Sequence, residues 1–495
     1  MIWSEQQSAI FEFVEKDSRS LVIEAVAGSG KTSTIVESAK RLDPFTSAVF
    51  LAFNKRVADT LKSKLPAHVP ALTLNALGHR AWKGFNGHYV EVDAYRVNAL
   101  VREMSDDSNV EFRSGVTKLV GLAKSVGLVP QYALEAFDGR ICGLVEDSDD
   151  VWSDLIDEYN VDFGWGGQNK HARALDLARK VLTRSIHTGG QKIDFNDQLY
   201  LPIIFGADWT KYELIFVDEA QDCSSINLEI VERSLAKNGR VIAVGDAAQA
   251  IYHFRGAGSN AMPDIVRRFQ AVELPLHTSY RCPKSVVRAA QAYVPHIQAR
   301  ADAEEGSVGA MLDWNADSFV REDVVLCRFN APLIKLAFQL IRARKACKVL
   351  GRDIGGGLVA LVAKLKAVNV RDLRGKLAAY VDKEAARLHR EGKPQAIGAL
   401  LDRVECLRVF MSELGDEADT SVLKQSIESL FSDEQNGSLT LSTIHKFKGA
   451  EADRIFWLNP NKASAYDAGN EEQVRNLKYV ATTRSKKSLH YIEAQ

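Results

Sequence analysis

Short apolar runs, each ending in a glycine-rich or polar turn, alternate with stretches of helical periodicity in the first part of the chain. At 214–217, for example, four apolar residues stand together, which is typical of a strand buried on both faces of a parallel sheet. The pattern therefore predicts an α/β fold. The elements expected here are strands at 20–26 and 48–53, helices at 31–41 and 55–65, and two further strands within 213–245.

The second part of the chain shows a similar pattern, and helical sequence interrupts both parts. Residues 76–192 and 352–435 have few strand signals, so each is interpreted as a helical insertion into a sheet domain. The sheet domains expected are 1–75 with 193–260, and 261–351 with 436–495. The elements expected in the second are strands at 271–274, 323–327, 438–442, 454–458 and 488–492, and helices at 284–296, 331–344 and 472–482.

The composition excludes several classes of protein. The 495 residues suffice for two to four domains, and a net charge of −1 means that any nucleic acid must meet local basic surfaces. The six cysteines form no C-x-x-C pair, which excludes common zinc spacings and favours free thiols in a reducing compartment. Because the sequence shows neither a signal-peptide pattern nor an apolar run of membrane length, we expect a cytoplasmic, nucleoid-associated protein with no membrane partner.

An apolar strand, a small-residue turn and a helix follow one another at 22–32, as in a phosphate-binding loop. Gly28 and Gly30 let backbone N–H groups turn onto phosphate oxygens, and the positive helix N-terminus adds to that field. Lys31 is expected to reach the β- and γ-phosphates, and Thr32 to ligate Mg²⁺. A glycine-rich turn that binds nothing is the weaker interpretation. The loop residues expected to bind ATP are Ala27, Gly28, Ser29, Gly30, Lys31 and Thr32.

Two carboxylates follow the buried run 214–217. Asp218 suits Mg²⁺ coordination, and Glu219 suits a general base that orients and deprotonates the attacking water. Neighbouring carboxylates beside a nucleotide repel each other unless a cation lies between them, so the pair itself favours Mg²⁺. The alternative is a solvated acidic loop, which the phosphate-binding loop upstream makes less attractive.

A third polar loop follows the next buried strand and carries two kinds of group. Asp246 and Gln249 can hydrogen-bond water held by a phosphate or a metal. Tyr252, Phe254 and Arg255 are side chains that suit unstacked bases and backbone phosphates. Taken alone, the segment is equally well explained as an aromatic-rich surface loop. Beside the other two loops, it predicts a link between a nucleotide and a nucleic acid.

The order of these segments resembles that of the superfamily 1 DNA helicases of the UvrD/PcrA/Rep group, in a compact variant, over nearly the whole chain. The resemblance implies two RecA-like P-loop cores, each with a mainly helical insertion, and ATP with Mg²⁺ as cofactors. It implies that Gln6 reads the adenine edge, with Gln7 as the alternative register, and that Tyr280 stacks on the base and Glu451 binds the ribose. The catalytic residues so implied are Lys31, Asp218, Glu219, Gln249, Arg281 and Arg484, the two arginines also binding ATP.

The same resemblance places several segments on DNA. Asn75 stands where the family usually has His, Phe254 stands where it commonly has Trp, and 192–199 is similar to the segment that closes the first insertion. Core packing or a surface loop remains the alternative for any single residue. The residues implied to bind DNA are Phe53, Asn54, Thr73, Tyr252, Phe254, Arg255, Asn330, Thr443 and His445.

Two groups of basic residues in the insertions are candidates for a strand path, although solvated helix faces explain each residue better. They are Lys170, His171, Arg173, Arg179, Lys180 and Arg184 in the first insertion, and Lys364, Lys366, Arg371, Arg374 and Lys376 in the second.

The function predicted is an ATP-dependent DNA helicase or translocase on single-stranded DNA, with 3′→5′ polarity implied by resemblance alone. The family's duplex-separating hairpin is expected to be missing after Arg484, and the second insertion is short, so translocation is better supported than processive unwinding. A translocase that strips proteins from single strands, a partner-dependent ATPase switch and an RNA substrate remain alternatives. The partners expected are single-stranded DNA, duplex junctions and a protein such as a nuclease, polymerase or single-strand binding protein. Replication, repair, recombination and a viral origin all stay open.

Overall fold

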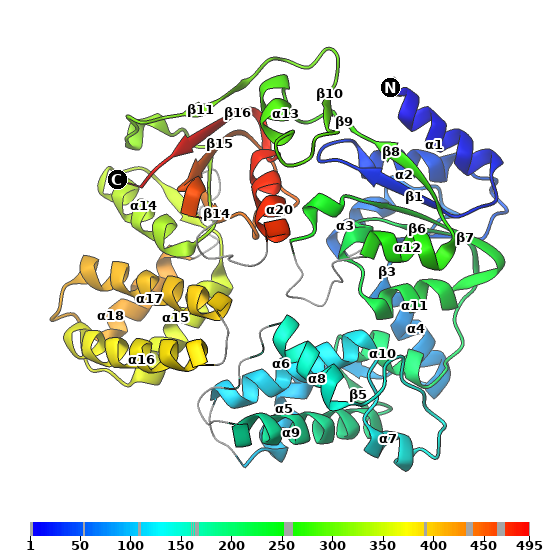
Figure 1. Ribbon diagram of the computed structural model, residues 1–495, viewed down its shortest axis with the longest axis horizontal. Coiled ribbons are helices and arrows are strands. Elements are labelled where there is room, and N and C mark those ends of the chain that lie inside the picture. Colours follow the sequence, from blue (N-terminus) through cyan, green and yellow to red (C-terminus); the bar gives the residue numbers. More distant parts are fainter. Residues whose placement is uncertain are drawn as a thin grey trace. The chain divides into compact units, whose positions relative to one another are not determined.

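The structure is a computed structural model that describes residues 3–52, 55–106, 110–159, 161, 163, 168–251, 261–390, 394–431, 439–462 and 471–494. Its contacts divide the chain into two compact units, Met1–Val26 with Gly30–His277, and Ala27–Ser29 with Thr278–Gln495. Each unit contains a six-stranded parallel sheet flanked by helices (Figure 1), so the predicted α/β class with two nucleotide-binding-type cores is confirmed. The detailed domain boundaries stay a prediction.

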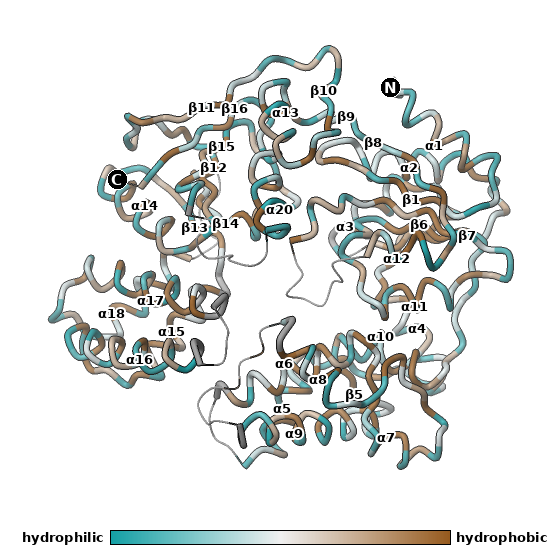
Figure 2. The backbone as a smooth tube through the Cα atoms, viewed as in Figure 1, coloured by the Kyte–Doolittle hydropathy of each residue, from teal (hydrophilic) through white to brown (hydrophobic). Residues whose placement is uncertain are grey.

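The first sheet has the strand order β3-β2-β6-β7-β1-β8, and every neighbouring pair is parallel. Strand β2 is buried along its whole length, as expected for an apolar run covered on both faces. Figure 2 shows the strands of this sheet as predominantly hydrophobic stretches between helices of mixed character. The strands are β1 (Leu21–Ala25), β2 (Ala48–Ala52), β3 (Ala71–Thr73), β6 (Tyr212–Val217), β7 (Leu235–Gly245) and β8 (Val272–Leu276).

Helices cover both faces of this sheet. On one face, alternate strand residues such as Ile23 and Phe50 pack with apolar residues of the first three helices, among them Ile10 and Ile35. On the other face, Val22 and Leu51 belong to a core that continues into the neighbouring helices. The helices are α1 (Glu5–Lys16), α2 (Lys31–Lys40), α3 (Lys55–Lys62), α10 (Asp197–Ile204), α11 (Ser225–Arg233) and α12 (Ala261–Phe269).

A group of helices, called here the first helical region, lies between β3 and β6 in sequence and extends from the second face of the sheet (Figure 1). Gly78 on α4 crosses α10 so closely that a Cβ there would lie 2.1 Å from the carbonyl oxygen of Gln198. A two-stranded parallel ladder of β4 (Glu91–Val92) and β5 (Lys192–Ile193) closes the region. Its helices are α4 (Leu74–Asn86), α5 (Arg96–Met104), α6 (Val110–Val126), α7 (Gln131–Ala136), α8 (Asp149–Glu158) and α9 (Gln168–His187).

One predicted strand belongs to a different sheet from the one expected. The strand expected at 271–274 to open the second α/β unit is β8, which pairs in parallel with β1 from Leu21↔Val272 to Ala25↔Leu276. Its burial alternates because it forms an edge of the sheet. A short apolar run carries no information about which sheet it joins, so the assignment to the second unit was wrong.

The second sheet has the order β11-β16-β15-β12-β14-β13 and is also entirely parallel. Strands β11 and β13, which are four and three residues long and form the two edges of the sheet, were not predicted. The strands are β11 (Ser307–Ala310), β12 (Val324–Cys327), β13 (Cys347–Val349), β14 (Leu439–Thr443), β15 (Ala452–Leu458) and β16 (Ser485–Ile492); β9 (Thr278–Ser279) pairs separately with β10 (Gln298–Ala299). The flanking helices are α13 (Lys284–Ala290), α14 (Asn330–Arg342) and α20 (Glu471–Thr482).

Four further helices form the second helical region, drawn in yellow and orange in Figure 1. They share one apolar core with α14 and the strands beside it. They are α15 (Arg352–Leu365), α16 (Val370–Arg390), α17 (Pro394–Leu414) and α18 (Thr420–Leu430). None of the helices in the described part of the chain combines the length and apolar character that crossing a bilayer requires.

Candidate functional site

The phosphate-binding loop occupies the turn between β1 and α2. Gly28 and Gly30 have φ angles of 71° and 81°, the left-handed region that favours glycine. Gly30 is the N-cap of α2, so the first turn of that helix begins at Lys31. Ala27 and Ser29 are fully buried. The loop therefore has the backbone conformation and the helix start expected of a phosphate cradle.

Two side chains of α2 face the ends of neighbouring strands. The hydroxyl of Thr32 donates to Oδ2 of Asp218 at 2.8 Å, directly after β6. Lys31 Nζ lies 3.8 Å from Oδ2 of Asp246, directly after β7. Since β6, β7 and β1 are consecutive in the sheet, the three loops meet at one carboxyl edge. Ligands of open α/β sheets bind at such edges.

Asp218 and Glu219 show the properties expected at a site for a cation. Burial, reinforced by the charge of Glu219, raises the pKa of Asp218 from 3.8 to about 6. Glu219 has a φ of 51°, which is strained for a residue with a side chain and often marks a functional position. The backbone N–H of Glu219 donates to Oδ1 of Asp218 at 2.9 Å. A hydroxyl and a carboxylate placed together fit Mg²⁺, which takes few protein oxygens besides phosphate and water.

Gln221 is a residue of this edge that the sequence analysis missed. It is 2 % exposed, and its Nε2 donates to Oε2 of Glu219 at 2.6 Å. Its Oε1 accepts from the backbone N–H of Asp246 at 3.0 Å. Gln249 then donates to Oδ2 of Asp246 at 2.5 Å. A buried chain of hydrogen bonds thus joins the carboxylate of Glu219 to Gln249. The signal available was only that a polar residue follows a buried strand.

Little room exists beside Gln221. A Cβ at Gly245 would lie 2.8 Å from Oε1 of Gln221 and 2.5 Å from Sδ of Met262. Gly245 is the last residue of β7, so this close approach sets where the loop with Asp246 begins. The two loops are therefore held against each other by packing as well as by hydrogen bonds.

The two glutamines of α1 occupy different surroundings. Gln7 is buried and forms a capping box with Ser4, and its Nε2 donates to the hydroxyl of Thr34 at 3.0 Å. Oε1 of Gln6 accepts from the backbone N–H of His277 at 2.9 Å, and its side chain is partly exposed. Because Gln7 is used within the fold, the geometry favours Gln6 as the residue open to a ligand.

The two arginines of the second unit that are predicted to bind ATP form ion pairs or hydrogen bonds with neighbouring residues. Nε of Arg281 pairs with Glu451, and its Nη1 donates to the carbonyl of Thr483 at 3.4 Å. Arg484 is 1 % exposed, and its guanidinium donates to the carbonyls of Val480 and Ala450. Tyr280 is 36 % exposed, as a stacking residue requires.

The candidate nucleic-acid residues of the first unit are partly described. Thr73 ends β3, and its hydroxyl accepts from the N–H of Ala76 at the start of α4. Nδ2 of Asn75 donates to the carbonyl of Phe195 at 2.7 Å and to Oε1 of Gln198 at 2.9 Å. Phe53, Asn54, Tyr252, Phe254 and Arg255 lie outside the described residues.

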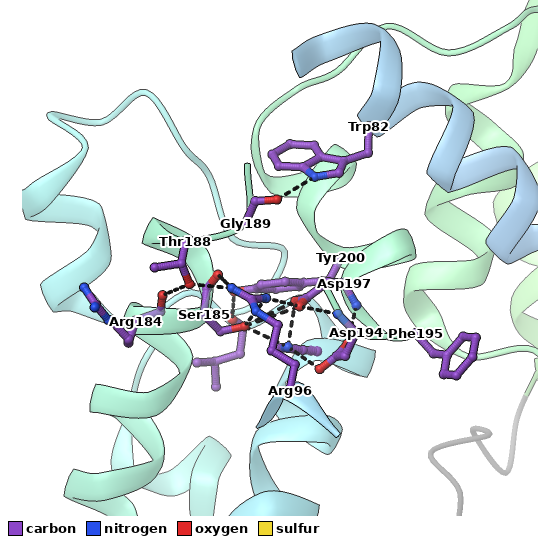
Figure 3. A network of polar contacts seen from close by, with 12 residues as sticks. Trp82, Arg96, Arg184, Ser185, Thr188, Gly189, Asp194, Phe195, Asp197 and Tyr200 are labelled. Carbon is purple, nitrogen blue, oxygen red and sulfur yellow. Dashed lines mark hydrogen bonds and ion pairs between the residues drawn. The ribbon is translucent and has the colours of Figure 1, made fainter. Parts of the chain in front are cut away.

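A network of buried charges holds the segment that carries Phe195 (Figure 3). Nζ of Lys124 on α6 lies 2.8 Å from Oδ2 of Asp194 and 2.6 Å from Oδ1 of Asp197. Nη1 of Arg96 on α5 lies 2.6 Å from Oδ2 of the same Asp197. Arg96 also donates to the backbone carbonyl of Ser185 on α9. Burial raises the pKa of Asp197, and the charges of Lys124 and Arg96 oppose that shift.

This network joins three helices of the first helical region to the loop before α10. Figure 3 shows the ring of Phe195 pointing away from the network, and the side chain is 57 % exposed. Asn75 binds the carbonyl of the same residue. The buried charges and Asn75 together fix the backbone at Phe195.

The candidate nucleic-acid residues of the second unit lie after two adjacent strands. Strands β12 and β14 pair in parallel with Cys327 opposite Thr443, so Asn330 and His445 follow neighbouring strand ends. Nη1 of Arg328 lies 3.4 Å from Nδ1 of His445, which links the two ends. Asn330 contacts a carboxylate of the second helical region. The structure thus brings Asn330, Thr443 and His445 to one edge.

The basic residues proposed as a strand path are largely engaged within the fold. Arg179 pairs with Asp147 and Asp149, and Lys170 is buried with its ammonium over the ring of Phe112. In the second helical region, Arg371 pairs with Glu417, Arg374 with Asp416 and Lys376 with Asp372. These contacts favour the structural interpretation of both basic groups.

Comparisons with known proteins agree with this geometry. The model of the UvrD/REP helicase N-terminal domain matches residues 3–270, and that of the UvrD-like helicase C-terminal domain matches 438–492. The chain is 22 % identical to F-box DNA helicase protein 1 of Schizosaccharomyces pombe over 98 % of its own length and 56 % of that protein.

Two further relatives are similar over shorter stretches. F-box DNA helicase 1 of Gallus gallus is 28 % identical over 51 % of the chain and 24 % of that protein. The ATP-dependent DNA helicase PcrA of Leuconostoc citreum is 22 % identical over 58 % of the chain and 39 % of that protein. The chain spans about half or less of the length of these relatives.

Proposed function

We propose, since the chain belongs to the UvrD/REP helicase family, that it is an ATP-dependent DNA helicase or translocase that moves on single-stranded DNA. The observation that carries the proposal is the meeting of Lys31 and Thr32 with Asp218 and Asp246 at one carboxyl edge. A phosphate cradle, a cation site and a candidate general base are thereby brought within one buried hydrogen-bonded cluster.

In this proposal the backbone amides of 28–32 bind the phosphates, and Lys31 neutralises the β- and γ-phosphates. Thr32 and Asp218 hold Mg²⁺, which when bound neutralises charge on the phosphate oxygens. Glu219 orients the attacking water and accepts its proton, while Gln221 holds the carboxylate of Glu219 in place. Gln6 binds the adenine edge. Tyr280, Arg281, Glu451 and Arg484 are the contributions proposed for the second unit.

The hydrogen-bonded chain from Glu219 to Gln249 supports coupling between hydrolysis and the nucleic acid. Gln249 precedes in sequence the aromatic residues proposed to contact DNA, so loss of the γ-phosphate would act on them through Asp246 and Gln249. In the second unit, Asn330, Thr443 and His445 are proposed contacts at the edge formed by β12 and β14. Stacking and phosphate contacts of this kind tolerate any base sequence, as a translocase requires.

The test compares ATP hydrolysis without nucleic acid, with single-stranded DNA and with RNA, and then the unwinding of duplexes with 3′ or 5′ tails. We expect stimulation by single-stranded DNA and unwinding from a 3′ tail. Stimulation without unwinding would favour a translocase that strips proteins from single strands. Hydrolysis indifferent to every nucleic acid would contradict the proposal and favour an ATPase switch that needs a protein partner.

A further inference from the structure

A carboxylate of the second helical region caps the first helix after β12. Asp402 of α17 accepts hydrogen bonds from the backbone N–H of Asn330 at 3.1 Å and of Ala331 at 3.0 Å. Both groups belong to the first turn of α14, where N–H groups have no partner within the helix. Asp402 therefore acts as an N-cap that comes from a distant part of the sequence rather than from the preceding residue.

The same carboxylate holds the side chain of Asn330. Nδ2 of Asn330 donates to Oδ2 of Asp402 at 2.9 Å. An ionised carboxylate only accepts hydrogen bonds, so it forces the amide to present its NH₂ group to Asp402 and its oxygen to the other side. Oδ1 of Asn330 is buried and has no hydrogen-bond partner among the described residues. Asp402 thus decides which end of the amide faces α17 and which end is turned away from it.

The contact between Asp402 and Asn330 lies beside other candidate nucleic-acid residues. Asn330 lies after β12, beside the strand end that carries Thr443 and His445, and Arg328 links the two ends. Helix α17 shares an apolar core with α14, so the carboxylate is delivered from a packed element rather than a free loop. A change in α17 would therefore be transmitted directly to the amide of Asn330.

We propose that Asp402 is a positioning residue for nucleic-acid binding, and that the second helical region thereby forms part of the nucleic-acid site. The inference rests on the proposed function. Asp402 sets the rotamer and hydrogen-bonding polarity of Asn330 and fixes the start of α14. It does not touch the nucleic acid itself.

The variant that tests this is Asp402→Asn, which keeps the size and the capping ability of the side chain. An amide can donate as well as accept, so Asn330 is free to turn over. We expect the concentration of single-stranded DNA that half-maximally stimulates ATP hydrolysis to rise about five-fold, the usual effect of losing one ordinary hydrogen bond. Hydrolysis without DNA and the KM for ATP should not change.

The matched control is Glu405→Gln on the exposed face of the same helix, which removes the same charge one turn away. It should leave DNA stimulation as in the wild type. The double variant Asp402→Asn with Asn330→Ala should resemble Asn330→Ala alone, because residues that act through one another are not additive. A merely structural role for Asp402 would instead lower the melting temperature and every activity together.

Two results would overturn the inference. One is unchanged DNA dependence in Asp402→Asn while Asn330→Ala weakens DNA stimulation. The other is full additivity of the two substitutions. If the wild type itself shows no stimulation by DNA, the proposed function has failed, and that outcome is distinct from either of these.

Discussion

The two helical regions are attached to their sheets by carboxylates in different environments. In the first unit, Asp194 and Asp197 meet Lys124 and Arg96, and each of the four side chains is less than a tenth exposed. In the second unit, Asp402 is partly exposed and meets two backbone amides and one side-chain amide. The first attachment holds the segment that Asn75 binds, next to the candidate nucleic-acid residue Thr73, and the second holds the candidate residue Asn330.

The burial of these two attachments determines how rigidly each one holds the neighbouring backbone. Removing one member of a buried ion network leaves the remaining charges without compensation, so the network is kept whole or lost altogether. A helix cap loses only a modest free energy when its residue changes. The edge at Phe195 is therefore expected to be fixed by the fold, and the edge at Asn330 to be adjustable.

The largest effect is expected for Lys124→Met. The substitution leaves Asp194 and Asp197 without their shared cation, so the free energy of unfolding should fall by about 3–5 kcal/mol. Urea unfolding measures it. The control Lys180→Met removes the exposed pair with Asp176 and should leave the free energy of unfolding nearly unchanged. Equal decreases in the free energy of unfolding for both variants would mean that the buried network contributes no more to stability than an exposed ion pair.

Asp218 provides a reference outside both helical regions. Its folded pKa, about 6, lies above its ordinary value of 3.8, so the folded chain binds the extra proton. The free energy of unfolding of the nucleotide-free chain should therefore fall as the pH rises from about 4 to about 6, by up to about 3 kcal/mol from this group. Asp218→Asn should remove that slope, whereas Lys124→Met should keep it. Identical slopes in wild type and Asp218→Asn would contradict the assignment.

Asn75→Ala should have an intermediate effect at the first edge. It removes the hydrogen bonds to the carbonyl of Phe195 and to Gln198, so about 1–2 kcal/mol of stability should be lost. Because Phe195 remains held by the buried network, DNA stimulation should weaken only several-fold. Asn86→Ala serves as control, since that side chain donates to the carbonyl of Trp82 within its own helix. A complete loss of DNA stimulation in Asn75→Ala would show that the buried network does not fix this edge.

The smallest change in stability is expected for Asp402→Ala. Loss of the cap should lower the free energy of unfolding by about 1 kcal/mol, measured by urea unfolding beside Lys124→Met. A loss of stability as large as that of Lys124→Met would mean that both helical regions are attached with similar strength, contrary to the difference expected here.

Much of the fold was predictable because the signals are local. The phosphate-binding loop and the Asp218–Glu219 pair each directly follow a mostly apolar run, and the structure has strands at these places. The position of β8 was not predictable, because the partner of an edge strand is decided by tertiary packing.

The contacts that attach the helical regions were also invisible in the sequence. Lys124 meets Asp194 across 70 residues, and Asp402 meets Asn330 across 72. Single charged residues on helices are usually solvated, so nothing in the local pattern distinguishes these from their neighbours. Gln221 was missed for a related reason, since its importance comes from Asp246 in another loop.

The most direct test of the proposed function is the ATPase activity of Glu219→Gln, measured with and without single-stranded DNA beside nucleotide and DNA binding. Glu213→Gln, an exposed change on β6, the strand that precedes Glu219, is the control. The variant should bind nucleotide and DNA like the wild type and lose DNA-stimulated hydrolysis by at least about a hundred-fold, as expected when a general base is removed. Wild-type turnover in Glu219→Gln would contradict the account.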